Sequence, residues 1–372
     1  MDKDDLWAEI QINNRSSNCD QSPAQVSANR DSGRRSAPEH RPSATSQIPR
    51  KLFSMIDLHL TIGLSRSPYT EALFDGSVRA PGIDLTLRTK FGDGYDNVGA
   101  RHRDIIAGKI AGGELSISSY ILAYLRGVKL IALPVFLSRR FRLRCMYCRL
   151  DSPLTHPAQL AGKIVTVHRY NATTPVWLRG ILENEFGVPP RAIDWRVAEP
   201  DIAEESLRPP PADVRVSFIP EPRNREKAMA LVESGAIDAA LEPYTTPNIR
   251  FIMSDSDYRQ AEQQFYRRTG AYTTNHLFAL STAVTEAHPW VVERMLTAMT
   301  QANDLADRYR TDKQRAEAAW EREVMGEDFQ YSLKRGCARR SVETLIEYQI
   351  QQGILEQRPN LDSLFADQTL DV

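Results

Sequence analysis

The sequence predicts an α/β protein of two lobes. From about residue 52, short apolar stretches with the two-residue period of a strand alternate with helical stretches, which is typical of a mainly parallel sheet. The chain has 372 residues and 41% hydrophobic content, which is enough for one large core or two moderate ones. Near residue 151 the pattern of helix, glycine turn and strand starts again, as expected where a second lobe opens.

The elements of the first lobe follow from period and turn residues. Residues 57–63 alternate as a strand does, and the turn Arg79-Ala-Pro-Gly82 precedes a second strand. A helix ends at Gly127, because glycine accepts the left-handed conformation that closes many helices. The elements expected here are strands at 57–63, 83–88, 114–117, 130–136 and 141–150, and helices at 100–108 and 120–126.

The same signals predict the second lobe and a return to the first. Gly187 and Gly235 each follow a helical stretch, and Pro289 suits a first helical turn before an apolar stripe that reaches Leu305. The elements expected are strands at 163–167, 237–241 and 275–281, and helices at 175–186, 226–234 and beyond 289. The predicted boundaries are 52–147 for the first part of lobe one, 148–270 for lobe two, and 271–372 for the second part of lobe one with the C-terminal helices.

Residues 1–51 are a different kind of sequence. Between Asn13 and Gln47, Val26 is the only Val, Ile, Leu, Met or Phe, so this segment cannot bury enough apolar surface to offset its ordering entropy. We expect a disordered N-terminal extension. Its acidic start and its lack of an apolar run predict no export signal and no membrane anchor, and Met55 is an alternative start.

Composition restricts the partners. A formal net charge of −1 gives no general attraction for nucleic acid or for an anionic membrane, so any affinity for anions must be local. The four cysteines are too few and scattered for a disulfide framework, which fits a reducing, cytoplasmic compartment. Cys145 and Cys148 would face opposite sides of a strand, so we expect no metal, and no cofactor motif is present. The sequence leaves the oligomeric state open, including a homo-oligomer.

Two polar turns between a strand and a helix could bind an anion. In Glu114-Leu-Ser-Ile-Ser-Ser-Tyr120, serine hydroxyls can cap the helix while its free N–H groups and positive dipole end hold an anion. The stretch 167–180 repeats this device, with Thr173 and Thr174 as expected caps. Two helix N-termini facing each other across a cleft suit a ligand with two carboxylates. The alternative in each case is an ordinary capped helix.

Cationic residues gather at two further places, Ser138-Arg-Arg-Phe-Arg142 and Tyr266-Arg-Arg-Thr-Gly270. Guanidinium groups suit carboxylate recognition, although charge runs are usually solvated faces. The segment from Tyr266 to Leu280 also carries His276, just before an apolar strand.

These motifs together resemble the 4,5-dihydroxyphthalate decarboxylase family, which has a periplasmic-binding-protein-like fold of type 2. The resemblance covers roughly residues 55–310 and is most specific at 114–120, 134–141, 177–182 and 266–276. It implies a ligand cleft between the lobes and a small anionic aromatic substrate. The chain departs from the family pattern after the first strand, where Leu64-Ser-Arg-Ser67 retains Arg66 but lacks the acidic residue that the family usually has there.

The resemblance implies a decarboxylase of 4,5-dihydroxyphthalate or a related hydroxylated aromatic acid, which releases CO2 and, from that substrate, protocatechuate. Such a reaction needs a proton at the ring carbon that bears the carboxylate and a base near the para hydroxyl. His276 is the expected acid, and Glu114 or Glu242 is the expected base. The expected substrate-binding residues are Arg66, Ser116, Ser118, Ser119, Arg139, Arg140, Tyr170, Asn171, Thr173, Thr174 and Arg268.

Alternatives remain for these assignments. His276 could be a core histidine, and Glu242 could cap or bridge the hinge between the lobes. At the level of the whole protein, the alternative is a non-catalytic solute-binding or sensory protein that uses the same cleft for a small anionic ligand. The expected lack of an export signal favours the enzyme.

Overall fold

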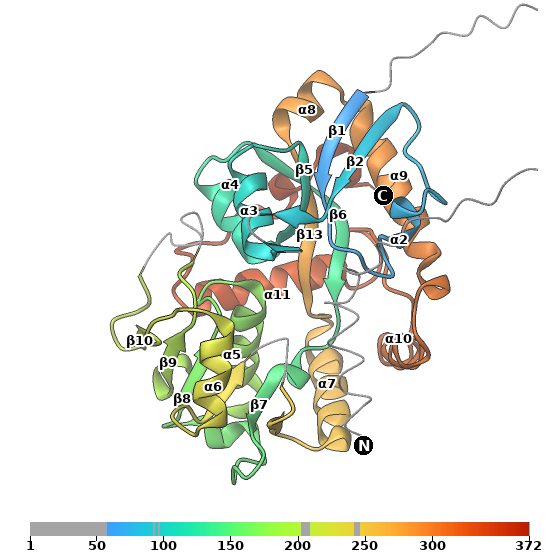
Figure 1. Cartoon of the computed structure of the whole chain (residues 1–372). Helices are drawn as coiled ribbons and strands as arrows, with labels where there is room; N and C mark the ends of the chain where they lie inside the picture. The colour runs from blue at the N-terminus through green and yellow to red at the C-terminus, as the bar shows by residue number, and fades with distance from the viewer. Residues whose placement is uncertain (1–57, 92–93, 96, 202–208, 242–245, 372) are drawn as a thin grey trace, which may run out of the picture. The chain divides into compact units, whose positions relative to one another are not determined.

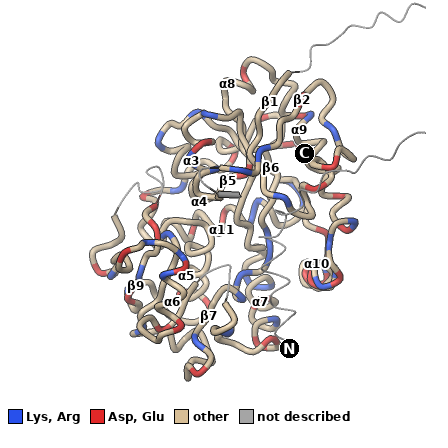
Figure 2. The backbone as a smooth tube through the Cα atoms, in the orientation of Figure 1, with Lys and Arg blue, Asp and Glu red and all other residues tan. Residues whose placement is uncertain are grey.

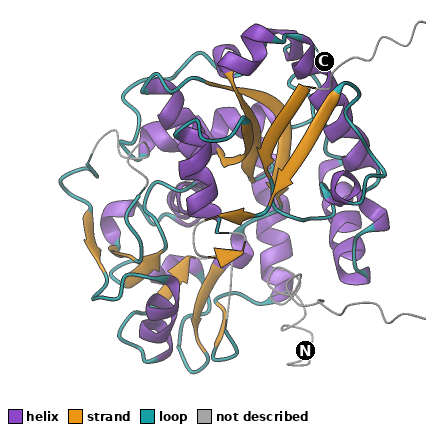
Figure 3. Ribbon diagram, turned by 45° about the horizontal axis from the view of Figure 1, so that its top comes forward, coloured by secondary structure: helices purple, strands orange, loops and turns teal. Residues whose placement is uncertain are grey.

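The computed structural model describes residues 58–91, 94–95, 97–201, 209–241 and 246–371. The predicted N-terminal extension lies outside the described residues. From Leu58 onward the chain forms one compact unit that contains two main sheets with helices packed against them (Figures 1 and 3). No helix in the described part of the chain has the length and apolar character needed to cross a membrane.

The first sheet has five strands, and most of its strands are parallel. Strand β1 pairs in parallel with both β2 and β5, whereas β13 runs antiparallel between β5 and β6. The strands, in spatial order, are β2 (Ile83–Arg88), β1 (Leu58–Gly63), β5 (Gly112–Ser116), β13 (Thr274–Ser281) and β6 (Leu130–Arg139). Its helices are α2 (Glu71–Phe74), α3 (Val98–Ile106), α4 (Ile117–Leu125), α8 (Thr282–Ala287) and α9 (Trp290–Asp304).

The second sheet has six strands and the same mixture of directions. Strands β8, β9, β10 and β11 are parallel, and β7 runs antiparallel between β11 and β12. The strands, in spatial order, are β10 (Arg215–Phe218), β9 (Asp194–Val197), β8 (Ile164–Val167), β11 (Ala239–Leu241), β7 (Met146–Arg149) and β12 (Ile249–Phe251). Helices α5 (Thr173–Phe186) and α6 (Arg225–Glu233) follow β8 and β10, and a separate hairpin joins β3 (Lys90–Phe91) to β4 (Gly94–Tyr95).

The chain crosses between the two sheets twice. It leaves the first sheet after β6, enters the second at β7, and returns through α7 (Asp255–Thr269) to β13. It then continues into α10 (Asp312–Met325) and α11 (Ala338–Gln351). The predicted two-lobed α/β fold, with the order lobe one, lobe two, lobe one, is confirmed. The residue boundaries proposed for the lobes stay predictions.

The predicted strand at 141–150 is wrong in its first half. Residues Leu143–Cys145 form a 3-10 turn, and only Met146–Arg149 form a strand. The backbone N–H groups of Phe141 and Leu143 donate to the carboxylates of Glu321 and Glu262 instead of to a neighbouring strand. This segment is the first crossing, where the chain belongs to neither sheet.

One buried hydrophobic cluster includes residues of both sheets. Trp177 of α5 is fully buried in it, and its indole N–H donates to the carbonyl of Thr274 at the start of β13 (2.8 Å). Gly180 of the same helix lies against α11, because a Cβ atom there would come within 2.1 Å of the Tyr348 ring. These contacts fix the start of α5 relative to the start of β13.

Candidate active site

The polar residues of interest gather at one edge of the first sheet. Because β13 is antiparallel to β5 and β6, its first residues meet the carboxyl ends of those strands, and His276 lies directly opposite Ser116. The chain after β1 reaches the same edge. Gly113 allows this close approach, since it has a φ of 150° and a Cβ atom there would lie 2.1 Å from the carbonyl oxygen of Gly63.

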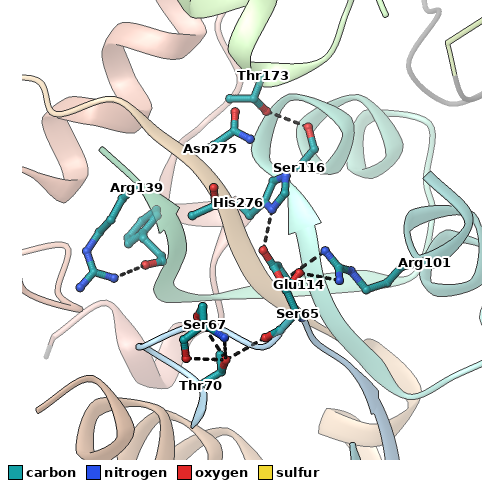
Figure 4. Close-up of polar contacts among 12 residues, drawn as sticks. Ser65, Ser67, Thr70, Arg101, Glu114, Ser116, Arg139, Thr173, Asn275 and His276 are labelled. Atoms are coloured by element: carbon teal, nitrogen blue, oxygen red, sulfur yellow. Dashed lines mark hydrogen bonds and ion pairs between the residues drawn. The ribbon is translucent and has the colours of Figure 1, made fainter. Parts of the chain in front are cut away.

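A buried carboxylate lies at the centre of this edge (Figure 4). Glu114 is 4% exposed, and its oxygens accept from Nδ1 of His276 at 2.6 Å and from the backbone N–H of Ser65 at 3.0 Å. The guanidinium of Arg101, which is fully buried on α3, lies 3.2 Å from the same carboxylate. Three donors from three different elements therefore surround Glu114.

These contacts decide the charge of each group. Burial alone would raise the pKa of Glu114, but Arg101, His276 and the Ser65 N–H together hold that pKa well below its ordinary value. Burial lowers the pKa of His276, the hydrogen bond that His276 donates to Glu114 opposes that effect, and the charge of Arg101 adds to it. Glu114 is therefore ionised at neutral pH, and His276 is mostly neutral in the free protein.

The geometry makes a poor base of Glu114. Its oxygens already bind three donors, and its low pKa makes it a weak proton acceptor. The predicted role of Glu114 as a base is therefore corrected. Its surroundings favour a role in orienting His276. The other predicted base, Glu242, lies outside the described residues.

The N-termini of α4 and α5 lie in direct contact beside this pair. The Thr173 hydroxyl is 2.7 Å from that of Ser116 and accepts from the backbone N–H of Ser118 at 2.9 Å. The Ser118 hydroxyl donates to the carbonyl of Asn171 (2.7 Å), and the Ser116 hydroxyl accepts from the N–H of Ser119 (3.5 Å). The structure thus brings together the predicted residues of both polar turns.

The predicted caps of α5 are a further correction. The N-cap of α5 is Ala172, with no side-chain cap bond, and Thr173 and Thr174 lie in its first turn. Their hydroxyls instead bond across to the first lobe, since Thr173 reaches α4 and Thr174 donates to the side chain of Asn275 (2.9 Å). Both threonines lie at the start of α5, as the pattern predicts, but their hydroxyls have other partners than a cap would.

Sequence reasoning missed several residues of this edge. Arg101 and His102 lie in a short predicted helix, and both are fully buried. The His102 ring packs edge-on against His276, with centroids 5.3 Å apart. Arg142 is also buried, donates to the Ser138 hydroxyl (3.2 Å), and its charge acts on His276. The available signal was the run Arg101-His-Arg103, three cationic or titratable residues in a helix of nine.

Three predicted arginines lie elsewhere. Arg66 forms a half-exposed ion pair with Glu71 (3.3 Å). Arg268, in the last turn of α7, forms an ion pair with Glu185 of α5. Arg140 approaches the Sγ atom of Cys145 (3.6 Å). The assignment of Arg268 to the site is therefore corrected, because it belongs to a helix end and has a carboxylate partner there.

Arg139 and Tyr170 are buried, and their contacts are with residues other than Glu114 and His276. Arg139 donates to the Phe136 carbonyl and to the hydroxyl of Tyr331, and it lines a cavity of about 530 Å³ beside α9 and α10. Tyr170 stacks under Arg179, whose guanidinium carbon is 3.8 Å from the ring centroid. Neither prediction gains support from the geometry of the site.

Acidic and basic positions are interspersed along the backbone (Figure 2). An attraction for anions therefore depends on local groups, as the net charge of −1 indicates. In the part of the chain that the structure describes, no group of three or more His, Cys, Asp or Glu residues could hold a metal ion.

Fold and site define a two-lobed α/β protein, with a polar cluster where the lobes meet. Solved structures with a similar fold include the aliphatic sulphonate binding protein SsuA of Escherichia coli (12% identity, 79% of each chain, TM-score 0.43). The alkanesulfonate-binding protein SsuA of Xanthomonas axonopodis pv. citri is another (14% identity, 83% of this chain and 98% of that one, TM-score 0.47). The strand order, rather than these distant likenesses, defines the fold.

Sequence comparison identifies the family. No family model matches the chain. The 4,5-dihydroxyphthalate decarboxylase of Pseudomonas putida is 31% identical over 200 residues, which are 53% of this chain and 74% of that protein. The enzyme of the same name from Comamonas testosteroni is 28% identical over 263 residues, 68% of this chain and 77% of that protein. The chain belongs to the 4,5-dihydroxyphthalate decarboxylase family.

Proposed function

We propose that this chain is a carboxy-lyase that removes one carboxylate from 4,5-dihydroxyphthalate or a related hydroxylated aromatic acid. The products are CO2 and, from that substrate, protocatechuate. Both relatives described above carry the name of this activity. The structural observation that supports it is the Glu114–His276 pair, held at 2.6 Å beside two helix N-termini.

The surroundings of the pair suit a substrate with two carboxylates. Helices α4 and α5 begin at this edge, and each contributes a positive dipole end with N–H groups. Burial lowers the pKa of Arg142 to about 10, so this guanidinium stays charged at neutral pH. A dianion at this position therefore meets fixed positive charge from both lobes.

In the proposed reaction His276 supplies the proton. Its Nδ1 is bonded to Glu114, which leaves Nε2 for the substrate. Nε2 transfers a proton to the ring carbon that bears the carboxylate, with electron density supplied by the hydroxyl para to that carbon. The bond to the carboxylate carbon then breaks, its electron pair restores the aromatic ring, and CO2 leaves. Each turnover takes up one proton from the solvent, which recharges His276.

Binding of the substrate favours the protonated form of His276. In the free protein the pKa of His276 is lowered, first by burial, so the imidazole is mostly neutral. Two carboxylates placed nearby favour the charged imidazolium, because an opposite charge stabilises it. The buried charge of Glu114 stabilises the same form. We expect His276 to take up its proton when the dianion binds.

The test is to mix purified protein with 4,5-dihydroxyphthalate and to measure CO2 and protocatechuate together. Equal amounts of both products are expected, at a rate proportional to the protein concentration. Saturable binding without release of CO2 would contradict the proposal and would favour the solute-binding or sensory alternative.

A further inference from the structure

His102 is a buried histidine of α3 that lies beside His276. Its side chain is 0% exposed on α3, and among the described residues neither ring nitrogen has a partner. Buried polar groups are nearly always hydrogen-bonded, because an unpaired one loses its hydration without compensation. His276, whose ring lies 5.3 Å away, has Glu114 as its partner. The two neighbouring histidines are therefore in opposite situations.

The neighbours of His102 are cationic or titratable groups from several elements. Arg101 precedes it on α3, His276 packs against it from β13, and the charges of His168 and Arg169 act on it from the turn after β8. Burial and these charges hold the pKa of His102 well below its ordinary value. A neutral imidazole has one N–H donor and one nitrogen that accepts a hydrogen bond.

Among the described residues, the proposed reaction still needs a group that accepts a hydrogen bond from the ring hydroxyl. Glu114 cannot serve, since its oxygens bind Arg101, His276 and the N–H of Ser65. In 4,5-dihydroxyphthalate each hydroxyl lies para to one carboxylate-bearing carbon. When His276 protonates one of these ring carbons, the hydroxyl para to that carbon lies on the opposite side of the ring. A second group is needed there to accept a hydrogen bond from the hydroxyl.

We propose that His102 accepts a hydrogen bond from the ring hydroxyl para to the departing carboxylate. This inference rests on the proposed function and adds a second group that touches the substrate. As electron density moves from the oxygen into the ring, the hydroxyl becomes more acidic and its bond to the imidazole nitrogen strengthens. The hydroxyl proton stays in that bond, or moves to the nitrogen and returns to the oxygen when CO2 leaves. Such a bond is stronger in the transition state than in the bound substrate, so it accelerates the reaction.

The test compares two probes on three proteins. Wild type, His102→Phe and His102→Asn are titrated calorimetrically with 4,5-dihydroxyphthalate and with phthalate, which has both carboxylates and no hydroxyl. We expect His102→Phe to weaken binding of the hydroxylated probe about 10-fold, the range of one lost hydrogen bond, with phthalate binding unchanged. The turnover number is expected to fall further than the affinity. His102→Asn, which keeps an acceptor, is expected to restore part of both.

The control is His59→Phe, at an exposed histidine of β1 paired with Asp84, which should change neither probe. Melting temperatures of all variants show whether each protein is folded. If the affinities for both probes fall together, or if neither falls, the inference is overturned, since His102 then binds a carboxylate or is structural. If the wild type binds both probes but releases no CO2, the proposed function fails. The affinities of wild type and His102→Phe for the two probes still show whether His102 binds the hydroxyl.

Discussion

Glu114 carries a negative charge in the interior of the protein, and its contacts explain why the charge is tolerated. An ionised carboxylate loses several kcal/mol of hydration on burial unless donors replace the water. Arg101, His276 and the Ser65 N–H supply those donors from three elements. The same contacts fix the orientation of the His276 ring. At the scale of residues, the charge of one side chain therefore positions the proposed proton donor.

Glu114→Gln tests this arrangement, because it keeps the shape and removes the charge. The buried guanidinium of Arg101 then loses its ion pair with Glu114, so the free energy of unfolding is expected to fall by about 3–5 kcal/mol. The pKa of His276 falls further, since Glu114 raises it. Less of the imidazolium is present at neutral pH, and the decline of kcat with rising pH moves to lower pH. Denaturant unfolding and a pH profile of kcat measure the two effects.

The matched control is Glu71→Gln, which breaks the half-exposed pair with Arg66. An exposed pair contributes about 0–1 kcal/mol, so little change in stability and none in kcat is expected. If Glu114→Gln leaves the pH profile of kcat where it was, Glu114 does not act through His276.

At the scale of elements, the starts of α4 and α5 are joined by hydroxyl groups. The Thr173 hydroxyl accepts from the N–H of Ser118 and contacts the Ser116 hydroxyl. Thr173→Val keeps the shape but removes the acceptor of the buried Ser118 N–H and the hydroxyl that contacts Ser116. We expect stability to fall by about 1–3 kcal/mol, and the affinity for a dianion to fall as the two helix starts lose their alignment.

Thermal unfolding and titration with phthalate measure these two effects. Thr285→Val is the control, since that hydroxyl donates to the carbonyl of Thr282 within α8 and does not join α4 to α5. A Thr173→Val protein with the stability and phthalate affinity of the wild type would show that the hydroxyl contact does not align the helices.

Most elements could be predicted from the sequence because their signals are local. Period and glycine caps gave β1, β2, β6 and α5 to within a few residues, as the bounds of these elements show. The error at Leu143–Cys145 has a nonlocal cause, because carboxylates of α7 and α10 bind that backbone. Thr173 was found as a polar residue at a helix start, but its partner is 55 residues away in the chain.

The site shows the same division. Glu114, Ser116 and His276 lie in motifs that the family resemblance marks, and the structure brings them together. Arg101 and His102 have no motif of their own, and only the packing of α3 against β5 reveals them. Arg268 was misplaced because charge alone does not distinguish a site from the end of a helix.

At the scale of the whole molecule, two buried carboxylates hold the first crossing between the sheets. Glu262 accepts from the N–H of Leu143 (3.1 Å), and Glu321 accepts from that of Phe141 (3.2 Å). Burial raises the pKa of Glu262 to about 8 and that of Glu321 to about 7. Both pKa values exceed those of the unfolded chain, near 4.5. Their contribution to stability is therefore complete below pH 4.5 and is lost as the pH rises through 7 and 8.

Glu262→Gln tests this dependence, because the amide oxygen can still accept from Leu143 and cannot ionise. Each unit of pKa shift corresponds to about 1.4 kcal/mol, so the variant is expected to be more stable than the wild type at pH 9 and similar at pH 5. Urea unfolding between pH 5 and pH 9 gives the slope of the free energy of unfolding against pH. Glu286→Gln, at an exposed position of α8, should follow the wild type. An equal slope in Glu262→Gln and the wild type would show that Glu262 does not contribute to the pH dependence of stability.

In the proposed reaction His276 delivers the proton that replaces CO2, and a substitution at this residue tests that role. His276→Gln and the wild type are titrated with 4,5-dihydroxyphthalate, and CO2 release is measured at saturation. We expect similar affinities and a kcat about 100-fold to 10,000-fold lower in the variant, the usual contribution of a general acid. A variant that binds the substrate and releases CO2 at the wild-type rate would contradict it.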